Sequence, residues 1–290
     1  MRIRTLSIVI CLMAIASCDF RKSIHKDLIT GLVTRGDGLS CEDVKLNIDD
    51  EIIQRNSFVY GEDFVLSFIN IEGFDKVDNH AFPGMNLNVI SQSGDTVLKN
   101  RDLYADMVDG TDLSPLRLNT KITVGDPIHS NEEYTLHVSI WDKKSDGVFT
   151  AKFNFDVVPN DQIYVESENI TYREVYLYSK QRQKVIVDNM ASFDENIYIM
   201  VEGLEGFVVE NDKVSVGLSM KINDEEGNVI VDEENLLGSS EYDYSEVYAR
   251  LSANFIITGS TIDNPIDCQI VIWDMKSSET FKAFTQLHIE

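Results

Sequence analysis

The chain has 290 residues, which at roughly 100–200 residues per domain indicates about two domains. Its hydrophobic fraction of 43% is ordinary for a globular protein and argues against wholesale disorder. The formal net charge is −24, with 49 Asp and Glu against 25 Lys and Arg. Because such a surface repels phosphate backbones, we expect no nucleic-acid partner.

The first 17 residues have the pattern of a secretory signal peptide. Arg2 and Arg4 precede an apolar stretch, residues 6–16, which is shorter than the roughly 20 residues that span a bilayer. The stretch ends in "IASC", which resembles the lipobox of bacterial lipoproteins: an aliphatic residue, two small residues and then Cys18. The resemblance implies that Cys18 is acylated and becomes the first residue of the mature protein. Several acyl chains, at about 0.8 kcal/mol per buried CH₂, would hold the protein stably at the membrane.

Residues 18–38 are polar and show no strong periodicity, so the sequence predicts a tether between the lipid and the first domain. This segment contains Arg35-Gly36-Asp37, a tripeptide that resembles integrin ligands. Matches of three residues are common by chance, and a polar tether needs glycine and charge in any case. We expect no function from the tripeptide.

The rest of the chain reads as an internal duplication. "SIWDKKSDGVF" recurs as "VIWDMKSSETF", which places Trp141 and Trp273 132 positions apart. Upstream, Gly73 matches Gly206 at an offset of 133, and further matches follow in the same order. A repeat of about 130 residues has the size of an independent domain. We predict a first domain over 39–159 and a second over 160–290.

Each copy has the pattern of an antiparallel sheet. In "YTLHVSIW", the apolar residues Tyr134, Leu136, Val138 and Ile140 alternate with polar ones, which is typical of a strand with one buried face. "SQSGDT", "NDEEGN" and "DKKSDG" are predicted hairpin turns. About seven strands in each copy indicate an immunoglobulin-like β-sandwich. We expect the repeated tryptophan to anchor each core, and the following aspartate to pair with the lysine two positions beyond it.

Two cysteines remain beyond Cys11 and Cys18. Export makes a disulfide between Cys41 and Cys268 permissible. However, Cys268 lies in an alternating apolar run and would face a core as a small hydrophobic residue. We favour two free buried thiols, and the disulfide remains the alternative.

No motif of an enzyme occurs in the sequence. Phosphate-binding glycine loops, GxSxG, HExxH and CxxC are all absent. The five histidines are scattered without metal-ligand spacing, so no zinc site is expected. With 49 acidic residues, the presence of paired carboxylates discriminates nothing. We therefore predict no catalytic residues and a protein that is not an enzyme.

Two groups of residues are candidates for binding. Calcium takes six to eight oxygen ligands, and two acidic loops with glycines could supply some of them, although neither has EF-hand spacing and hydrated turns are the simpler interpretation. The calcium candidates are Asp106, Asp109, Asp112, Asp224 and Glu226. Tyrosines in "EYDYSEVY" could instead stack on a sugar face. These candidates are Tyr242, Tyr244 and Tyr248.

The lipobox, the repeated "GF…G" spacing and the "IWDKK" strand together resemble lipoproteins of the Bacteroidetes kind that hold tandem immunoglobulin-like domains. The resemblance implies an exported protein held by Cys18 in the cell envelope, in the outer membrane, and it brings no established activity. Since Cys18 is followed by Asp-Phe-Arg-Lys rather than by an acidic tag, the surface and the periplasmic face both remain open.

Three functions remain in competition. A non-enzymatic binding or adhesion module for a glycan or a protein is the first. A fimbrillin-like structural subunit, with Arg35 as its cleavage site, is the second. A hydrolase without a recognisable motif is the third. We favour the binding module.

Overall fold

A computed structural model describes residues 22–290, and these residues are mostly β-strand, joined by turns and loops. The described part of the chain contains a single helix, the six-residue α1 (Tyr244–Ala249). The protein is therefore all-β, as the alternating patterns predict. In residues 22–290, no helix is long and apolar enough to cross a bilayer.

The described residues form two compact units. The first contains residues 22–56, 64–121 and 134–154, and the second contains residues 57–63, 122–133 and 155–290.

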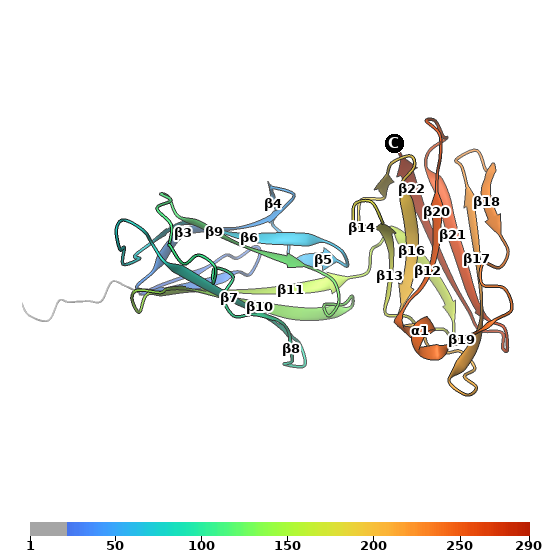
Figure 1. The fold of residues 1–290 in the computed structure, drawn as a ribbon, viewed down its shortest axis with the longest axis horizontal. Coiled ribbons are helices and arrows are strands. Elements are labelled where there is room, and N and C mark those ends of the chain that lie inside the picture. The colour runs from blue at the N-terminus through green and yellow to red at the C-terminus, as the bar shows by residue number, and fades with distance from the viewer. Residues whose placement is uncertain (1–21) are drawn as a thin grey trace, which may run out of the picture. The chain divides into compact units, whose positions relative to one another are not determined.

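Strands β1 to β11 form two sheets. Their bounds are β1 (Lys22–Lys26), β2 (Val33–Asp37), β3 (Ser40–Ile48), β4 (Glu51–Ile52), β5 (Ser57–Val59), β6 (Asp63–Glu72), β7 (Pro83–Ser91), β8 (Thr96–Asn100), β9 (Arg117–Thr123), β10 (Glu132–Asp142) and β11 (Val148–Val158). The larger sheet has the order β1-β2-β11-β10-β7-β8, and β5 pairs with β11. The smaller sheet has the order β4-β3-β6-β9. Figure 1 shows the two sheets as layers, with β3, β6 and β9 in one and β7, β10 and β11 in the other.

Strands β12 to β22 repeat this arrangement. Their bounds are β12 (Ile163–Glu168), β13 (Glu174–Ser179), β14 (Lys184–Ile186), β15 (Met190–Ala191), β16 (Asn196–Glu202), β17 (Lys213–Asn223), β18 (Val229–Glu233), β19 (Glu241–Asp243), β20 (Leu251–Ile256), β21 (Ile266–Asp274) and β22 (Thr280–Ile289). The larger sheet runs β12-β22-β21-β17-β18, and the smaller one runs β14-β13-β16-β20. Even the short parallel pairing of β5 with β11 recurs between β15 and β22. The two halves of the chain therefore share one topology.

The cores are made by the inward faces of these strands. In β10, Leu136, Val138 and Ile140 are buried while the residues between them are half-buried. In the first unit, the ring of Phe68 packs edge-on against Phe149 at 6.2 Å between centroids. Burying a large apolar side chain of this kind contributes about 1.5–3 kcal/mol, so the inward faces hold each sandwich together.

The two tryptophans do not anchor the cores, contrary to the prediction. Trp141 is the cross-strand partner of Gly84, and Trp273 is the partner of Gly217. Each indole lies against its glycine on the outward face: a Cβ added at Gly84 or Gly217 would lie 2.1 or 2.0 Å from an indole atom. The reason is parity along the strand, because Ile140 points inward and its neighbour must point outward.

The repeated aspartates also differ from the prediction of a strand-end ion pair. Asp142 is buried and accepts hydrogen bonds from the backbone N–H of Asp75 (2.7 Å) and Lys144 (3.0 Å) and from the Ser145 hydroxyl (2.7 Å). Asp274 accepts the equivalent three hydrogen bonds, from Val208 and Lys276 N–H and from the Ser277 hydroxyl. Each carboxylate therefore ties a hairpin to a distant loop of its own copy.

The segment predicted as a tether is partly ordered as sheet. Residues 22–26 and 33–37 form β1 and β2, and β2 pairs with both β1 and β11. Its inward residues are Thr34 and Gly36, which are small rather than apolar, so no hydrophobic alternation marks the strand. Arg35 lies within β2 rather than in a loop. The predicted signal peptide and the predicted acylation site, Cys18, lie outside the described residues.

Both cysteines of the described chain are free. Cys268 is fully buried, and burial raises the pKa of its thiol well above the ordinary range. Cys41 is half-buried, and its thiol lies 3.3 Å from the Ile69 carbonyl oxygen. The prediction that both thiols are free is confirmed, whereas the prediction that both are buried holds for Cys268 and not for Cys41.

Candidate binding groove

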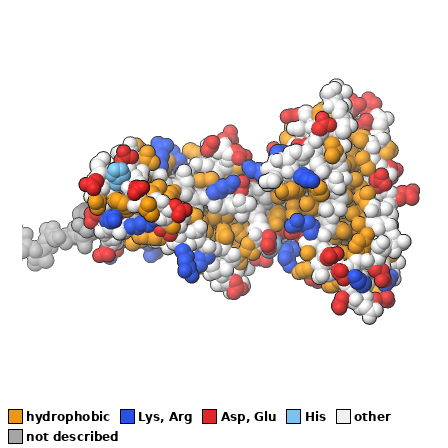
Figure 2. All heavy atoms as spheres, viewed as in Figure 1, with side chains coloured by type: hydrophobic (Ala, Val, Ile, Leu, Met, Phe, Trp, Pro, Cys, Tyr) orange, Lys and Arg blue, Asp and Glu red, His pale blue; other side chains and the backbone are white. Residues whose placement is uncertain are grey.

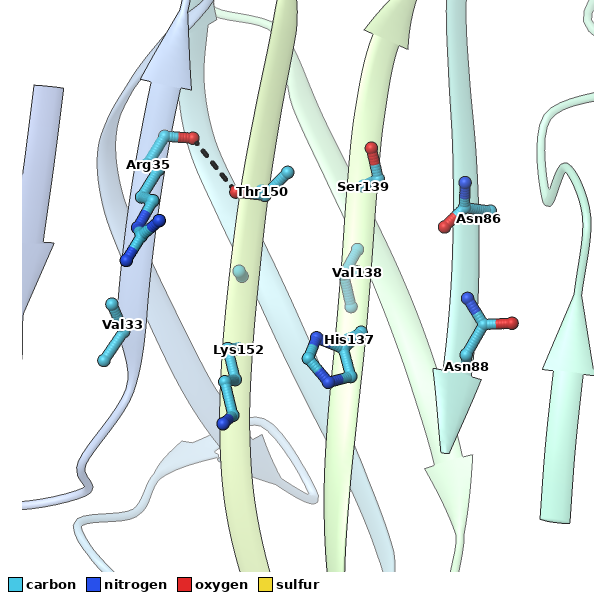
Figure 3. Close-up of a pocket in the computed structure, with 10 residues that line it drawn as sticks. Val33, Arg35, Asn86, Asn88, His137, Val138, Ser139, Thr150 and Lys152 are labelled. Atoms are coloured by element: carbon cyan, nitrogen blue, oxygen red, sulfur yellow. Dashed lines mark hydrogen bonds between the residues drawn. The ribbon is translucent and has the colours of Figure 1, made fainter. Parts of the chain in front are cut away.

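A polar groove lies on the outward face of the larger sheet in the first unit. Side chains from four neighbouring strands stand in two rows across it (Figure 3). One row runs Arg35, Thr150, Ser139, Asn86, and the other runs Val33, Lys152, His137, Asn88. The groove has a volume of about 450 Å³. Since neighbouring strands lie about 4.8 Å apart, each row spans about 14 Å, the length of a short oligosaccharide.

The side chains of the groove have few partners of their own. Within residues 22–290, six side chains of the groove have no hydrogen-bond or ion-pair partner. They are Arg35, Asn86, Asn88, His137, Ser139 and Lys152. The Thr150 hydroxyl is the exception, since it donates to the Arg35 carbonyl oxygen at 3.4 Å. On a sheet face the backbone donors and acceptors are used within the ladder, so these side chains supply the hydrogen bonds that a ligand would find.

The groove is cationic although the protein is acidic. Arg35 and Lys152 are exposed, and no Asp or Glu is among the lining residues. The carboxylate that follows in β2, Asp37, is paired with Lys22 at 3.4 Å. Burial lowers the pKa of His137, and the nearby charge of Lys152 lowers it further, which favours the neutral imidazole. On the face seen in Figure 2, acidic side chains are spread over both units, with Lys and Arg between them.

Trp141 continues the same face beyond the first row. It lies two residues after Ser139 on β10, and its cross-strand partner Gly84 lies two residues before Asn86 on β7. The missing side chain at Gly84 lets the indole lie close to the sheet. An amphipathic ring beside a row of hydrogen-bonding groups is an arrangement that suits a sugar, which has both apolar faces and hydroxyls.

A groove in the second unit covers part of the equivalent sheet face, over β17 and β21. A cavity of about 350 Å³ is lined there by Ser219, Lys221, Gln269, Val271 and Trp273, together with acidic residues of β18. These residues occupy the positions that Asn86, Asn88, His137, Ser139 and Trp141 occupy in the first copy. No residue of β12 or β22 lines this cavity, so the two grooves share only the part of the face over β7 and β10, where the side chains differ.

The acidic loops contain the calcium candidates. Among residues 22–290, no group of three or more His, Cys, Asp or Glu is placed to hold a metal ion. Asp224 closes its hairpin, accepting hydrogen bonds from the backbone N–H and the side-chain amide of Asn228 (2.8 and 2.9 Å). Glu226 is exposed in the same turn, and Asp106, Asp109 and Asp112 lie in the loop between β8 and β9.

The tyrosine candidates lie around α1 and do not line the groove. All three are half-buried. Tyr242 donates its hydroxyl to the Leu237 carbonyl oxygen at 2.8 Å, and Tyr248 accepts a hydrogen bond from Arg173 at 2.6 Å. The ring of Tyr244 lies 6.1 Å from that of Tyr248. Each ring therefore has internal contacts.

A buried polar cluster in the second unit involves two carboxylates on neighbouring strands. Glu174 of β13 and Glu202 of β16 are register partners, and both are buried. Glu202 accepts hydrogen bonds from Tyr176 (2.6 Å) and Arg250 (2.9 Å). Glu174 accepts two from Ser130, yet burial raises the pKa of its carboxyl. With its donors already supplied from within the protein, the cluster has the character of a structural network.

The sequence analysis did not single out the groove. Strand parity could have found it, because His137, Ser139 and Trp141 share the outward parity of β10. What parity does not supply is the order of strands in the sheet, which brings β2 and β7 to either side of the β11–β10 pair.

No protein-family model matches the chain. No curated protein matches it. A solved structure described as pT26-6p is similar over 93% of this chain, with 8% sequence identity and a TM-score of 0.28. The chain spans 65% of the length of that structure. At this TM-score the likeness does not indicate a shared fold.

Proposed function

We propose that this protein is a non-enzymatic binding module of the cell envelope that is held to the membrane through Cys18 and binds a glycan in the groove of its first unit. The observation that carries the proposal is the double row of side chains, all polar except Val33, that make almost no hydrogen bonds with the described protein. Because these side chains are open to solvent and the fold does not use their polar groups, a ligand can take the place of the water that would otherwise hydrate them.

The rows favour a glycan over a protein segment. A peptide that adds to a sheet uses the free backbone groups of an edge strand, whereas this groove lies over the interior strands β2, β11, β10 and β7. Asn86 and Asn88 each offer a donor and an acceptor, as sugar hydroxyls require. Trp141 adds a ring beside them.

A glycan array probed with the full chain in detergent tests the proposal. We expect binding to a subset of polysaccharides, and at least a tenfold loss in the double variant Asn86→Ala, Asn88→Ala. Asn119→Ala is the matched control, since Asn119 is an exposed asparagine of β9 in the opposite sheet. Absence of binding to every glycan, or unchanged binding by the double variant, would refute the proposal.

The membrane anchor has its own test. Cells grown with a labelled fatty acid should incorporate the label into the protein, and Cys18→Ala should abolish incorporation and release the protein from the membrane fraction. Cys41→Ala is the control, because Cys41 lies in β3 of the folded unit. Labelling that survives Cys18→Ala would place the acyl group elsewhere.

A further inference from the structure

We infer that the ligand of the first groove is an acidic polysaccharide, one that carries carboxylate or sulfate groups along its chain. The inference rests on the proposed function and adds the chemical class of the glycan. Arg35 and Lys152 lie on adjacent strands, β2 and β11, and point to the same side of the sheet. Neither cation has an ion-pair partner among the described residues.

Two unpaired cations lie together on this face although the chain is acidic. The chain has about twice as many acidic as basic side chains, and several of its other lysines are paired with a carboxylate. Lys143 pairs with Asp102 at 2.9 Å, and Lys276 pairs with Glu210 at 2.9 Å. The groove instead combines two cations with no carboxylate among its lining residues. An anionic group in the groove would therefore meet attraction without local competition.

The second copy shows that the fold does not require these cations. By strand register, the place of Arg35 and Thr150 is taken by Glu166 and Lys282, which pair with each other at 3.8 Å. The place of Val33 and Lys152 is taken by Tyr164 and Phe284, which are 62% and 37% exposed. At this position of the sheet, the second copy therefore has an ion pair and two aromatic rings, whereas the first copy has two cations without ion-pair partners.

The neutral side chains of the groove explain why the anion belongs to a sugar chain. Asn86, Asn88 and Ser139 stand beside the cations in the two rows and suit hydroxyl groups. Arg35 and Lys152 at one end of the rows and the amides at the other fit a ligand that presents an anionic group beside hydroxyl groups. A uronic acid or a sulfated sugar has both on one ring.

Three probes test the inference with the full chain in detergent at 150 mM NaCl: polygalacturonate, which carries carboxylates, chondroitin sulfate, which also carries sulfates, and neutral dextran. We expect at least one of the two acidic polymers to bind and dextran to bind at least tenfold more weakly. The double variant Arg35→Gln, Lys152→Gln should weaken acidic-polymer binding at least tenfold. Arg117→Gln, which removes an exposed arginine from β9 of the opposite sheet, should leave it unchanged.

The outcomes separate the two proposals. If dextran or another neutral glycan binds as tightly as the acidic polymers, the ligand class is wrong and glycan binding stands. If no glycan binds, both proposals fail. If the double variant keeps its affinity while its melting temperature matches the parent, the acidic ligand does not use this groove and the inference is wrong.

Discussion

Among the groove side chains, His137 is the residue whose charge can change near neutral pH. Burial and then the charge of Lys152 lower its pKa, so the imidazole gains a proton only below its ordinary range near pH 6.5. A bound anion favours the protonated form, and affinity for an acidic ligand must therefore rise as the pH falls through that pKa. Above it, affinity should not change with pH.

We predict that polygalacturonate binding is nearly constant between pH 8 and pH 7 and strengthens as the pH falls below the ordinary histidine pKa of about 6.5. His137→Gln should remove the increase and leave the affinity at pH 8 nearly unchanged. Isothermal titration calorimetry at each pH measures both. An equal increase in the variant would assign the proton to another group.

Asp142 illustrates how one buried carboxylate can fix a loop. Its three hydrogen bonds come from two backbone N–H groups and one hydroxyl, and Asp142→Ala would leave those donors in a partly buried place without an acceptor. We expect a loss of about 3 kcal/mol in the free energy of unfolding. Urea denaturation followed by circular dichroism checks this, and a loss below about 0.5 kcal/mol would contradict the assigned role. Asp146→Ala, an exposed aspartate in the same hairpin, is the control.

The raised pKa of Glu174 predicts how the free energy of unfolding depends on pH. Its pKa is raised in the folded state because burial outweighs the hydrogen bonds from Ser130. The stability that this group contributes is therefore fully present below the unfolded pKa of about 4.3 and is lost as the pH rises through the folded pKa. Glu174→Gln, which stays neutral, should gain stability relative to the parent between pH 4 and pH 7. A relative stability that falls over this range would show the opposite shift.

At the scale of the element, strand alternation was the most reliable guide. The pattern of β10 predicts the buried face correctly, and glycines at positions 94 and 227 adopt the positive φ that their hairpin turns require. Trp141 has the outward parity of β10 in the sequence, so the prediction that it anchors the core disagreed with the alternation of the same strand. A glycine on the next strand makes the outward position possible, and that pairing depends on register.

Strands β1 and β2 and the groove are further features of the structure that the sequence patterns did not predict. β1 and β2 were missed because β1 is exposed throughout and the inward residues of β2 are a threonine and a glycine. The groove was not predicted because β2 and β7 lie on either side of the β11–β10 pair in the sheet. In the sequence, β2 and β7 are far from that pair. Local patterns report which face of a strand is buried, whereas a binding face depends on which strands become neighbours.

The pairing of glycine and tryptophan across β7 and β10 can be tested directly. The chain has two tryptophans, so in a Trp273→Phe background the fluorescence reports Trp141 alone. Gly84→Ala should displace the indole, shift its emission to longer wavelength and cost about 1–3 kcal/mol of stability. Gly94→Ala, at a turn glycine with open space around it, should leave the emission unchanged. An unshifted spectrum in Gly84→Ala would mean that the contact is not required.

At the scale of the whole molecule, the net charge of −24 opposes the approach of an acidic ligand, while the groove attracts it at short range. Salt screens the long-range repulsion first, because the Debye length falls to about 10 Å at 0.1 M. We therefore predict that the association rate constant for polygalacturonate rises between 10 mM and 100 mM NaCl. Surface plasmon resonance measures it, and a rate that falls with salt would show that attraction dominates at all distances.

The pairs Gly84–Trp141 and Gly217–Trp273 mark equivalent points on two sheets that share the order of five strands. Since the inward faces and the hairpin aspartates carry the fold, the outward residues of one copy can be transplanted onto the other without redesigning a core. Each copy can therefore serve as a scaffold for the outward face of the other. A chimaera that carries the groove residues of the first copy on both copies would have two binding faces, made only from this protein's own residues.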